Sequence, residues 1–318
     1  MNSLELSILK TVAYFDVFKY PVSRNEIGYF LDQKYDEKAL SKALNNLLSH
    51  EVLFQLGNFY ALSNDANLVE RRIEGNNAAT DELRKAKKAS AFLYRWFPFI
   101  NGIGISGSLS KNVAYKDSDF DFFIITAENR LWIARTIFIF FYRVACLVGL
   151  KRMFCLNYLI DEKMLEIEEK NIFTAIEIST LLVCDGKDVY EKFFKANQWV
   201  ENIMPNYSPR FSEERFIKPA VFRRIIERLF NNEFGNKTNE KILKFYQRRW
   251  QKLSAKNIFT PKGFQLGGMV VTSHICKPLP QHFQQKILNY FTERFENAKK
   301  TMSEKLYFKT ERQLNATS

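Results

Sequence analysis

Histidine and cysteine are scarce in this sequence, and neither is arranged as a metal site or a disulfide framework. The chain of 318 residues has three histidines and four cysteines. The cysteines show no Cys-x-x-Cys spacing, and the histidines form no ligand pattern with them. These residues are Cys146, Cys155, Cys184, Cys276, His50, His274 and His282. We therefore expect neither structural zinc nor a set of disulfides.

The sequence also lacks a secretion signal and a long apolar run without charge. Its first residues, MNSLELSILK, do not show a basic stretch followed by an apolar one. The most hydrophobic window, Leu131–Leu150, contains Arg135 and Arg143, whose charges would be costly in lipid. We therefore expect a cytoplasmic protein that does not span a membrane.

Glycine and proline are few, with 12 and 8 residues, while 46% of the chain is hydrophobic. Such a composition excludes a disordered or fibrous chain, because enough apolar surface is present to bury a large core. The length predicts two or three domains. The changes of pattern along the chain predict an α+β protein.

Positive charge is concentrated in the last third of the chain. From Arg210 onward there are 22 Lys and Arg against 9 acidic residues, whereas the preceding residues are nearly neutral. This bias favours a polyanionic partner or nucleotide phosphates. In "FRRIIERLF" and "KILKFYQRRW", however, the basic residues alternate with apolar ones, which is typical of the solvated faces of amphipathic helices. Both interpretations stay open.

The first 65 residues have the pattern helix, helix, helix, hairpin. Apolar spacing predicts a helix over Leu4–Phe15, and the capping box Ser23–Glu26 opens a second helix that continues through Leu31. A third helix is predicted over Asp36–Ser49, and Gly57-Asn58 lies between two short apolar strands as a hairpin turn. The third helix has one apolar face: Leu40, Ala43, Leu44, Leu47 and Leu48.

This order resembles a winged helix-turn-helix domain. In DNA-binding members of that family, the third helix enters the major groove and presents basic or amide side chains. The exposed positions expected here are mixed in charge: Asp36, Glu37, Lys38, Lys42, Asn45 and Asn46. We therefore expect packing or partner binding rather than sequence-specific DNA binding, which remains the alternative.

Residues 104–126, GISGSLSKNVAYKDSDFDFFIIT, contain a glycine-serine corner after a short apolar strand. At Gly107 the chain is expected to turn from this strand into a helix, where a glycine lets a ligand approach the backbone. Ser108 offers a hydroxyl and an amide at the helix start, where phosphate is favoured. The corner is therefore a candidate phosphate site.

Two aspartates open the next predicted strand, Phe120–Thr126. Alternation along a strand places Asp119 and Asp121 on one face. Adjacent carboxylates repel each other unless a cation lies between them, and paired oxygen ligands suit Mg²⁺, which keeps other positions for water and phosphates. A phosphate corner beside a carboxylate pair indicates a site for a nucleoside triphosphate.

These motifs resemble the DNA polymerase β-like nucleotidyltransferase superfamily. Its signature is an apolar strand, Gly-Gly or Gly-Ser, a spacer, and Asp-apolar-Asp or Asp-apolar-Glu leading into an apolar strand. This chain has ISGS at 105–108, a spacer of ten residues and DFDF at 119–122. The "DSDFD" form, with Ser118 before the first acid, is similar to the bacterial branch, which has small-molecule and protein substrates.

The resemblance implies an Mg²⁺-dependent transfer in which a hydroxyl attacks the α-phosphate of a triphosphate and pyrophosphate leaves. It implies that Asp119 and Asp121 are catalytic metal ligands. The nucleotide-binding residues that it implies are Gly107, Ser108 and Ser118. Lys111, one turn beyond Ser108, either reaches the phosphates or is a solvated helix residue.

Active members usually carry another carboxylate on the neighbouring strand, which is predicted within Arg152–Asp161, after a hydrophobic helix over 129–150. The expected position holds Asn157, which cannot be a general base. Asp161 has the same parity but lies roughly 13 Å further along a strand and is expected to cap the following segment. Glu177, in a predicted helix, either supplies the missing carboxylate or is a half-exposed helix residue. Asn157 and Glu177 are thus further catalytic candidates.

Three hypotheses follow from this departure. The chain is an active nucleotidyltransferase, a nucleotide-binding but inactive relative that acts as a winged-helix regulator, or an interaction protein with the same fold. Because a carboxylate pair without a cation is destabilising, Asp119 and Asp121 favour the first hypothesis. The acceptor stays open, with a small molecule or a protein favoured over RNA.

The sequence predicts four regions: a winged-helix-like domain over 1–65, a linking helix over 66–98 that bends at Gly75, a nucleotidyltransferase core over 99–190 and a helical domain over 191–318. In the last region, "FQLGGMVVTSH" (residues 264–274) is the one stretch without a helical pattern. We expect it to be a connector.

Overall fold

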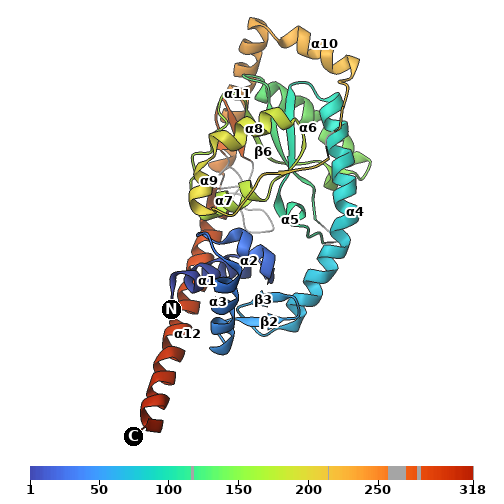
Figure 1. Cartoon of the computed structure of the whole chain (residues 1–318). Helices are drawn as coiled ribbons and strands as arrows, with labels where there is room; N and C mark the ends of the chain where they lie inside the picture. The colour runs from blue at the N-terminus through green and yellow to red at the C-terminus, as the bar shows by residue number, and fades with distance from the viewer. Residues whose placement is uncertain (116–117, 214, 257–269, 278–280, 318) are drawn as a thin grey trace.

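The chain folds as an α+β protein around a seven-stranded sheet, with a smaller three-stranded sheet near its N-terminus. The computed structural model describes residues 1–115, 118–213, 215–256, 270–277 and 281–317. Two long helices, α4 (Ala66–Trp96) and α12 (Gln281–Thr317), lie on different sides of the molecule (Figure 1). The prediction of an α+β chain with a largely helical C-terminal region is confirmed.

The three N-terminal helices agree with the sequence prediction. They are α1 (Ser3–Asp16), α2 (Arg24–Phe30) and α3 (Glu37–Ser49). The capping box that opens α2 is present: the Ser23 hydroxyl accepts from the Glu26 amide, and the Glu26 carboxylate accepts from the Ser23 amide. In α3 the predicted apolar face is buried, apart from Leu48, which is half-buried.

The predicted hairpin forms and gains a third strand. Its strands are β2 (Phe54–Leu56) and β3 (Phe59–Ala61), and Leu56 pairs with Phe59 across the turn. Gly57 has φ +61°, a left-handed conformation that glycine adopts without steric cost. A two-residue strand, β1 (Val22–Ser23), pairs with β3 and gives the order β1-β3-β2. Residues 1–61 are called the N-terminal unit below.

The predicted linking helix is α4, which runs without interruption through Gly75. Its Gly75 packs against the segment that follows the glycine-serine corner, since an added Cβ would lie 2.8 Å from Val113 Cγ1. The Gly75 carbonyl also accepts a hydrogen bond from the Ala114 amide at 3.0 Å. This glycine therefore allows α4 to lie directly on the chain that leads to the two aspartates.

The large sheet has the order β8-β7-β4-β5-β6-β10-β9. Its strands are β4 (Ile100–Ile105), β5 (Asp121–Thr126), β6 (Cys155–Asp161), β7 (Leu182–Asp185), β8 (Arg210–Phe211), β9 (Val270–Val271) and β10 (Ile275–Lys277). The strands predicted before Gly107, after Asp119 and around Asn157 are β4, β5 and β6. Strand β5 lies between antiparallel β4 and parallel β6, so all three candidate motifs meet on neighbouring strands.

Helices cover both faces of this sheet. Phe123 and Ile125 pack in one cluster with residues of α7 (Ile172–Ser179), α8 (Lys187–Ala196), α9 (Trp199–Ile203) and the N-terminal unit. Phe122 and Ile124 face the other way and pack with residues of α4, α6 (Leu131–Leu147) and α11 (Glu233–Ser254). The alternation that was predicted for β5 is therefore present, and it divides the core into two layers.

The most hydrophobic segment of the chain forms α6 inside the protein. Its Arg135 is buried, and the guanidinium carbon lies 4.3 Å from the Tyr246 ring centre and 4.7 Å from that of Trp250. Cation–π contacts of this kind stabilise the charge away from water. No helix in the described part of the chain is both long and apolar enough to span a bilayer.

The C-terminal region differs from the prediction because it is not only helical. Besides α10 (Val221–Phe230), α11 and α12, it supplies β8, β9 and β10 to the large sheet. Of the stretch predicted as a connector, residues 264–269 lie outside the described residues, and Val270–Val271 is strand β9. Strands of two or three residues are too short to show a period of two, so their pairing could not be read from the sequence.

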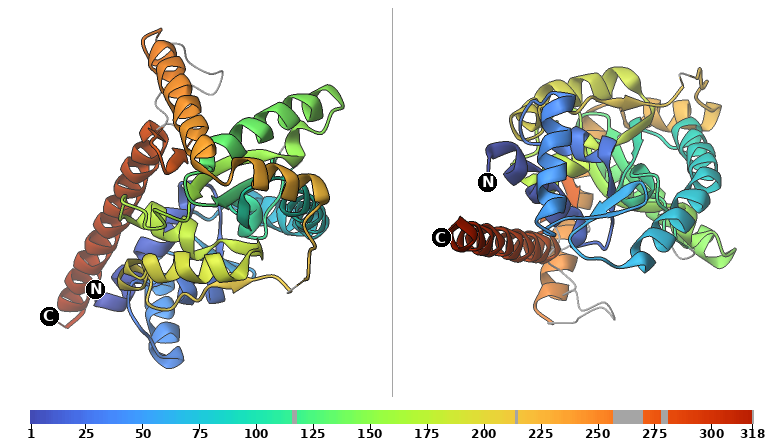
Figure 2. Two further views of the ribbon diagram at one scale, coloured as in Figure 1. Left: turned by 90° about the horizontal axis from the view of Figure 1, so that it is seen from above. Right: turned by 60° about the horizontal axis from the view of Figure 1, so that its bottom comes forward.

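Helix α12 returns to the N-terminal unit and lies beside it in both views of Figure 2. The rings of Tyr14 and Phe291 are 5.9 Å apart, and Arg294 forms an ion pair with Asp16 at 2.9 Å. Ile287, Phe291 and Met302 share a buried cluster with α1. The first and last described helices of the chain are thus packed together.

Candidate functional site

The glycine-serine corner lies directly against the second aspartate. Strand β4 ends at Ile105, and the chain enters the short helix α5 (Gly107–Ser110) through Gly107, which has φ +68°. A Cβ at this position would lie 2.4 Å from Asp121 Oδ2. Glycine is therefore required both for the backbone conformation and for the close approach of the corner to the carboxylate.

The two predicted acids stand at the start of β5. The Asp121 side chain is half-buried, on the strand face shared with Phe123 and Ile125, whereas Asp119 is exposed just before the strand. The Asp121 carbonyl accepts a hydrogen bond from the Ser106 amide at 2.8 Å, which joins the corner to the acid pair.

A pocket of about 750 Å³ is lined by all eight residues that the sequence assigned to the candidate site. These residues are Gly107, Ser108, Lys111, Ser118, Asp119, Asp121, Asn157 and Glu177. They come from the β4–α5 corner, the loop before β5, strand β6 and helix α7. A volume of this size is typical of pockets that bind small molecules or cofactors.

Carboxylates dominate the charge of this pocket. The pKa of Asp121 is raised from 3.8 to about 6, mainly by burial and also by the nearby Glu177 and Asp119 carboxylates. Cys155 pairs with Asp121 in the neighbouring strand. The pKa of its thiol is also raised, by burial and by the Asp121 and Asp119 carboxylates. The ionised Asp121 is therefore short of compensating positive charge.

Lys111 and Glu177 form an ion pair across the pocket lining. The distance from Lys111 Nζ to Glu177 Oε1 is 2.9 Å, and the ammonium also donates to the Gly107 carbonyl at 3.1 Å. The Lys111 side chain is only 15% exposed, so it is not a solvated helix residue. The pair places a cation and a third carboxylate beside the corner.

Asn157 occupies an irregularity in β6. The register between β5 and β6 shifts between Phe122/Leu156 and Phe123/Tyr158, so Asn157 has no partner in the pairing. Its amide nitrogen donates to Ser106 Oγ at 3.1 Å. The residue therefore supports the corner from the neighbouring strand and also lines the pocket.

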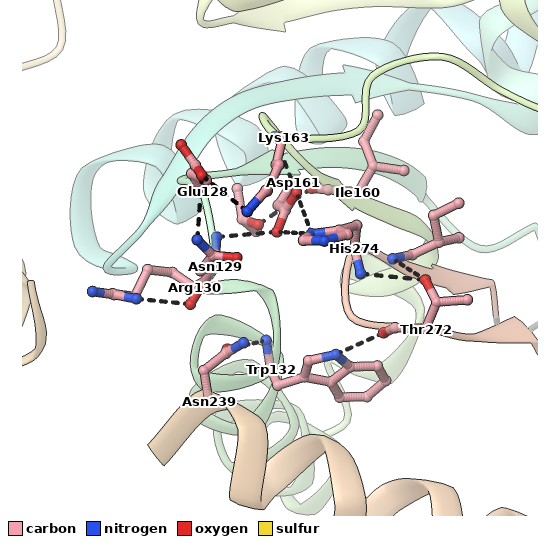
Figure 3. Close-up of polar contacts among 12 residues, drawn as sticks. Glu128, Asn129, Arg130, Trp132, Ile160, Asp161, Lys163, Asn239, Thr272 and His274 are labelled. Carbon is pink, nitrogen blue, oxygen red and sulfur yellow. Dashed lines mark hydrogen bonds and ion pairs between the residues drawn. The ribbon is translucent and has the colours of Figure 1, made fainter. Parts of the chain in front are cut away.

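Asp161 does not belong to the site, and its predicted alignment with the catalytic face was wrong. It pairs with Thr126, on the opposite face of the sheet from Asp121, because the irregularity at Asn157 breaks the alternation on which that prediction relied. Its carboxylate accepts from the amides of Asn129 and Lys163 and contacts His274 Nδ1 at 2.9 Å (Figure 3). The prediction that Asp161 caps the following segment is confirmed.

Ser118 lines the pocket, but its polar groups have structural partners. Its hydroxyl accepts a hydrogen bond from the Tyr115 amide at 2.9 Å, and its carbonyl accepts from the Arg152 guanidinium at 2.9 Å. This serine therefore fixes the loop in front of Asp119 and places only part of its surface in the pocket.

Sequence reasoning missed the contribution of the N-terminal unit and of α4 to this pocket. Tyr14, Phe15, Phe18 and Tyr20 line it, and so does Arg71. Arg71 is exposed, and its guanidinium carbon lies 4.6 Å from the Tyr115 ring centre. No local pattern marks these residues, because only the packing of the N-terminal unit on the core brings them to the site.

A magnesium ion fits the donor set at the corner. No cluster of three or more His, Cys, Asp or Glu side chains arranged to hold a metal occurs in the parts of the chain that the structure describes. Mg²⁺, however, usually takes one or two protein carboxylates and completes its shell with water and substrate phosphates. Asp119 and Asp121 are the side chains that could hold it, and a cation there would favour the ionised form of Asp121, which burial and the neighbouring carboxylates disfavour.

The raised pKa of Asp121 predicts that Asp121→Asn stabilises the protein without metal at neutral pH. Between about pH 4 and 6 the native state keeps a proton that the unfolded state has lost, so the free energy of unfolding falls as pH rises through this range. The pKa of Asp121 is about 6 in the native state against 3.8 for an unperturbed aspartate, and this difference lowers the free energy of unfolding by about 3 kcal/mol at pH 7. Urea unfolding of the chelator-treated protein should show this gain at pH 7 and none at pH 4. Asp119→Asn, at the exposed acid, should give a smaller gain, and equal stabilities of Asp121→Asn and wild type at pH 7 would contradict the electrostatic account.

Comparisons with known proteins give no relative for this chain: no family model, curated protein or solved structure matches it. The geometry of the pocket and the motif resemblance are therefore the grounds for assigning a function.

Proposed function

We propose that this protein is an Mg²⁺-dependent nucleotidyltransferase that transfers a nucleoside monophosphate from a triphosphate to a hydroxyl of an acceptor. One observation carries the proposal: the Gly107-Ser108 corner, Asp119 and Asp121 meet in one pocket, and a side chain at Gly107 would displace the Asp121 carboxylate. A scaffold without a ligand gains nothing from a half-buried carboxylate with a raised pKa beside another acid.

In this proposal the corner and the lysine bind the triphosphate. The Ser108 hydroxyl and amide and the Lys111 ammonium contact its phosphates. The Arg71 guanidinium, exposed in the same pocket, adds a second positive charge. Mg²⁺, held by Asp119 and Asp121, would neutralise charge on the phosphates.

The transfer itself needs a base for the acceptor hydroxyl. Glu177 is the best candidate, because Asn157 cannot accept the proton and Asp161 lies on the other face of the sheet. The hydroxyl oxygen forms a bond to the α-phosphorus, the bond to the leaving pyrophosphate breaks, and the proton passes to the Glu177 carboxylate. The ion pair with Lys111 orients this carboxylate.

The helix and strand order of the N-terminal unit supports a winged-helix fold. The order is α1, β1, α2, α3, β2, β3, with the short strands in one sheet. We propose that this unit packs on the enzyme rather than reading DNA, since its residues line the pocket. A triphosphate substrate and four free cysteines agree with a cytoplasmic protein.

The direct test is a screen of ATP, GTP, CTP and UTP for Mg²⁺-dependent stabilisation. A ligand that binds only the native state raises its melting temperature by mass action. We expect at least one of the four, at millimolar concentration, to raise it in a manner that EDTA reverses, together with pyrophosphate release when mixed hydroxyl acceptors are present. No shift with any of the four would reject both nucleotide hypotheses.

Asn157 supports one competing function, that of a nucleotide-binding but inactive regulator, because it replaces the carboxylate expected on this strand. The same experiment distinguishes the two functions: a regulator shows the rise in melting temperature without pyrophosphate release. It would also need a DNA-binding surface, and α3 offers Lys38 and Lys42 there. The acids beside them already have partners, since Asp36 caps the helix and Glu37 forms an ion pair with Arg24 at 2.7 Å.

We expect the full chain to bind random and genomic duplex DNA weakly at physiological salt. Few basic groups are available on α3 for phosphate contacts, and each such contact would steepen the salt dependence of binding. Fluorescence anisotropy from about 50 to 200 mM salt measures this slope. Tight, sequence-selective binding that Lys38→Glu with Lys42→Glu abolishes would instead favour the regulator.

A further inference from the structure

Aromatic residues of the N-terminal unit form one wall of the pocket. This aromatic wall consists of Tyr14, Phe15, Phe18 and Tyr20. Its rings are in mutual contact, with centres 5.6 Å apart for Tyr14 and Phe18 and 5.2 Å apart for Phe15 and Tyr20. Phe18 is 39% exposed, although its neighbours Tyr14 and Phe15 are almost fully buried. An aromatic surface is therefore open in the same pocket as the charged groups of the corner.

The wall is fixed relative to the phosphate corner. The Tyr20 hydroxyl donates to the Lys111 carbonyl at 3.1 Å and to Glu26 at 2.7 Å, and the Arg72 guanidinium carbon lies 3.7 Å from the Tyr20 ring centre. Lys111 directly follows α5. A ligand whose phosphates contact the corner can thus place another part of itself on a rigid aromatic surface.

The wall also carries a polar group without a partner. Tyr14 is 1% exposed, and in the described part of the chain its hydroxyl makes no hydrogen bond. Its pKa is raised by burial and by the nearby Glu177 carboxylate, and Tyr14 and Glu177 both line the pocket. A buried hydroxyl that lacks a partner is costly, and a ligand that accepts its hydrogen bond removes the cost.

We propose that the N-terminal unit forms the base-binding half of the nucleotide pocket, with the nucleobase stacked on Phe18 and the Tyr14 hydroxyl hydrogen-bonded to the nucleoside. This inference rests on the proposed function and names the part of the substrate that each half recognises. Stacking suits any base, because every base has a π face, so the wall selects a nucleotide over free polyphosphate rather than one base over another.

The test compares two ligands that differ in the nucleoside. Calorimetry with Mg²⁺ measures the affinity of the full chain for ATP, GTP, CTP and UTP and for inorganic tripolyphosphate, which has the phosphates alone. We expect wild type to bind the best triphosphate at least about tenfold more tightly than tripolyphosphate. Phe18→Ala should weaken that nucleotide about tenfold and leave tripolyphosphate unchanged. Tyr14→Phe should weaken it about fivefold without lowering the melting temperature of the free protein.

Phe140→Ala, at an exposed phenylalanine on α6 outside the pocket, is the matched control and should change neither affinity. Equal nucleotide affinities in wild type, Phe18→Ala and Tyr14→Phe would overturn the inference and leave the proposed function standing. The inference is also overturned if wild type binds tripolyphosphate as tightly as nucleotide, or if Phe18→Ala and Tyr14→Phe weaken the binding of both ligands equally. If wild type binds neither kind of ligand, the proposed function fails and the inference fails with it.

Discussion

Replacing both Asp119 and Asp121 with asparagine should lower the rate of pyrophosphate release by on the order of 10³-fold or more. It should also remove the rise in melting temperature that Mg²⁺ and nucleotide cause. The amides keep the size of the side chains but lose the charges that would hold the cation. Because the repulsion between the acids also disappears, the variant without metal should be at least as stable as wild type. Thermal unfolding and a coupled pyrophosphate assay measure both effects on one preparation.

A charge-matched control makes this result specific. Asp81→Asn with Asp188→Asn removes two exposed carboxylates that do not line the pocket, and it should leave nucleotide binding and turnover unchanged. If the Asp119 and Asp121 variant were unfolded, the acids would be structural. If it turned over at the wild-type rate, the pair would have no part in catalysis.

Glu177→Gln should lower turnover by about 10² to 10⁴-fold while the nucleotide still stabilises the protein. The amide retains the hydrogen bond to Lys111 but cannot take a proton from the acceptor. The loss should therefore fall on kcat, with little change in the apparent nucleotide affinity. Glu177→Asp should restore part of the rate, because a carboxylate is present again.

The matched control for this glutamate is Glu201→Gln, which removes an exposed carboxylate on α9. Undiminished turnover in Glu177→Gln would exclude this residue as the base. Loss of nucleotide binding in Glu177→Gln, without an effect on folding, would assign Glu177 to binding instead.

Local motifs were sufficient to find the candidate site from the sequence. The conformation of Gly107 and the alternation along β5 depend on a few adjacent residues, and both agree with their predictions; β5 itself begins at Asp121, one residue after the predicted start. The same holds for the capping box at Ser23 and for the two-residue turn at Gly57. Interactions within about five residues carry this information, so no knowledge of the tertiary fold was needed.

The remaining features depend on contacts between distant segments. Glu177 reaches the pocket because α7 packs beside the corner, and its ion pair with Lys111 spans 66 positions in the sequence. The irregularity at Asn157 reversed the face assigned to Asp161, since a single unpaired residue changes the parity of everything after it. The aromatic wall has no sequence signature, because Tyr14 and Phe15 look like ordinary core positions of an amphipathic helix. Phe18 and Tyr20 lie in the turn and loop that follow this helix.

The contact between α12 and α1 has a consequence for synthesis on the ribosome. Residues of α1 are made first, but the helix that covers Tyr14 begins only at Gln281. At about 5–20 residues per second, the apolar surface of α1 waits on the order of ten seconds to a minute for its cover. During that interval the nascent chain exposes a hydrophobic surface that chaperones can recognise. The pocket, whose aromatic wall includes Tyr14 and Phe15 of the same helix, acquires its final shape only after translation reaches α12.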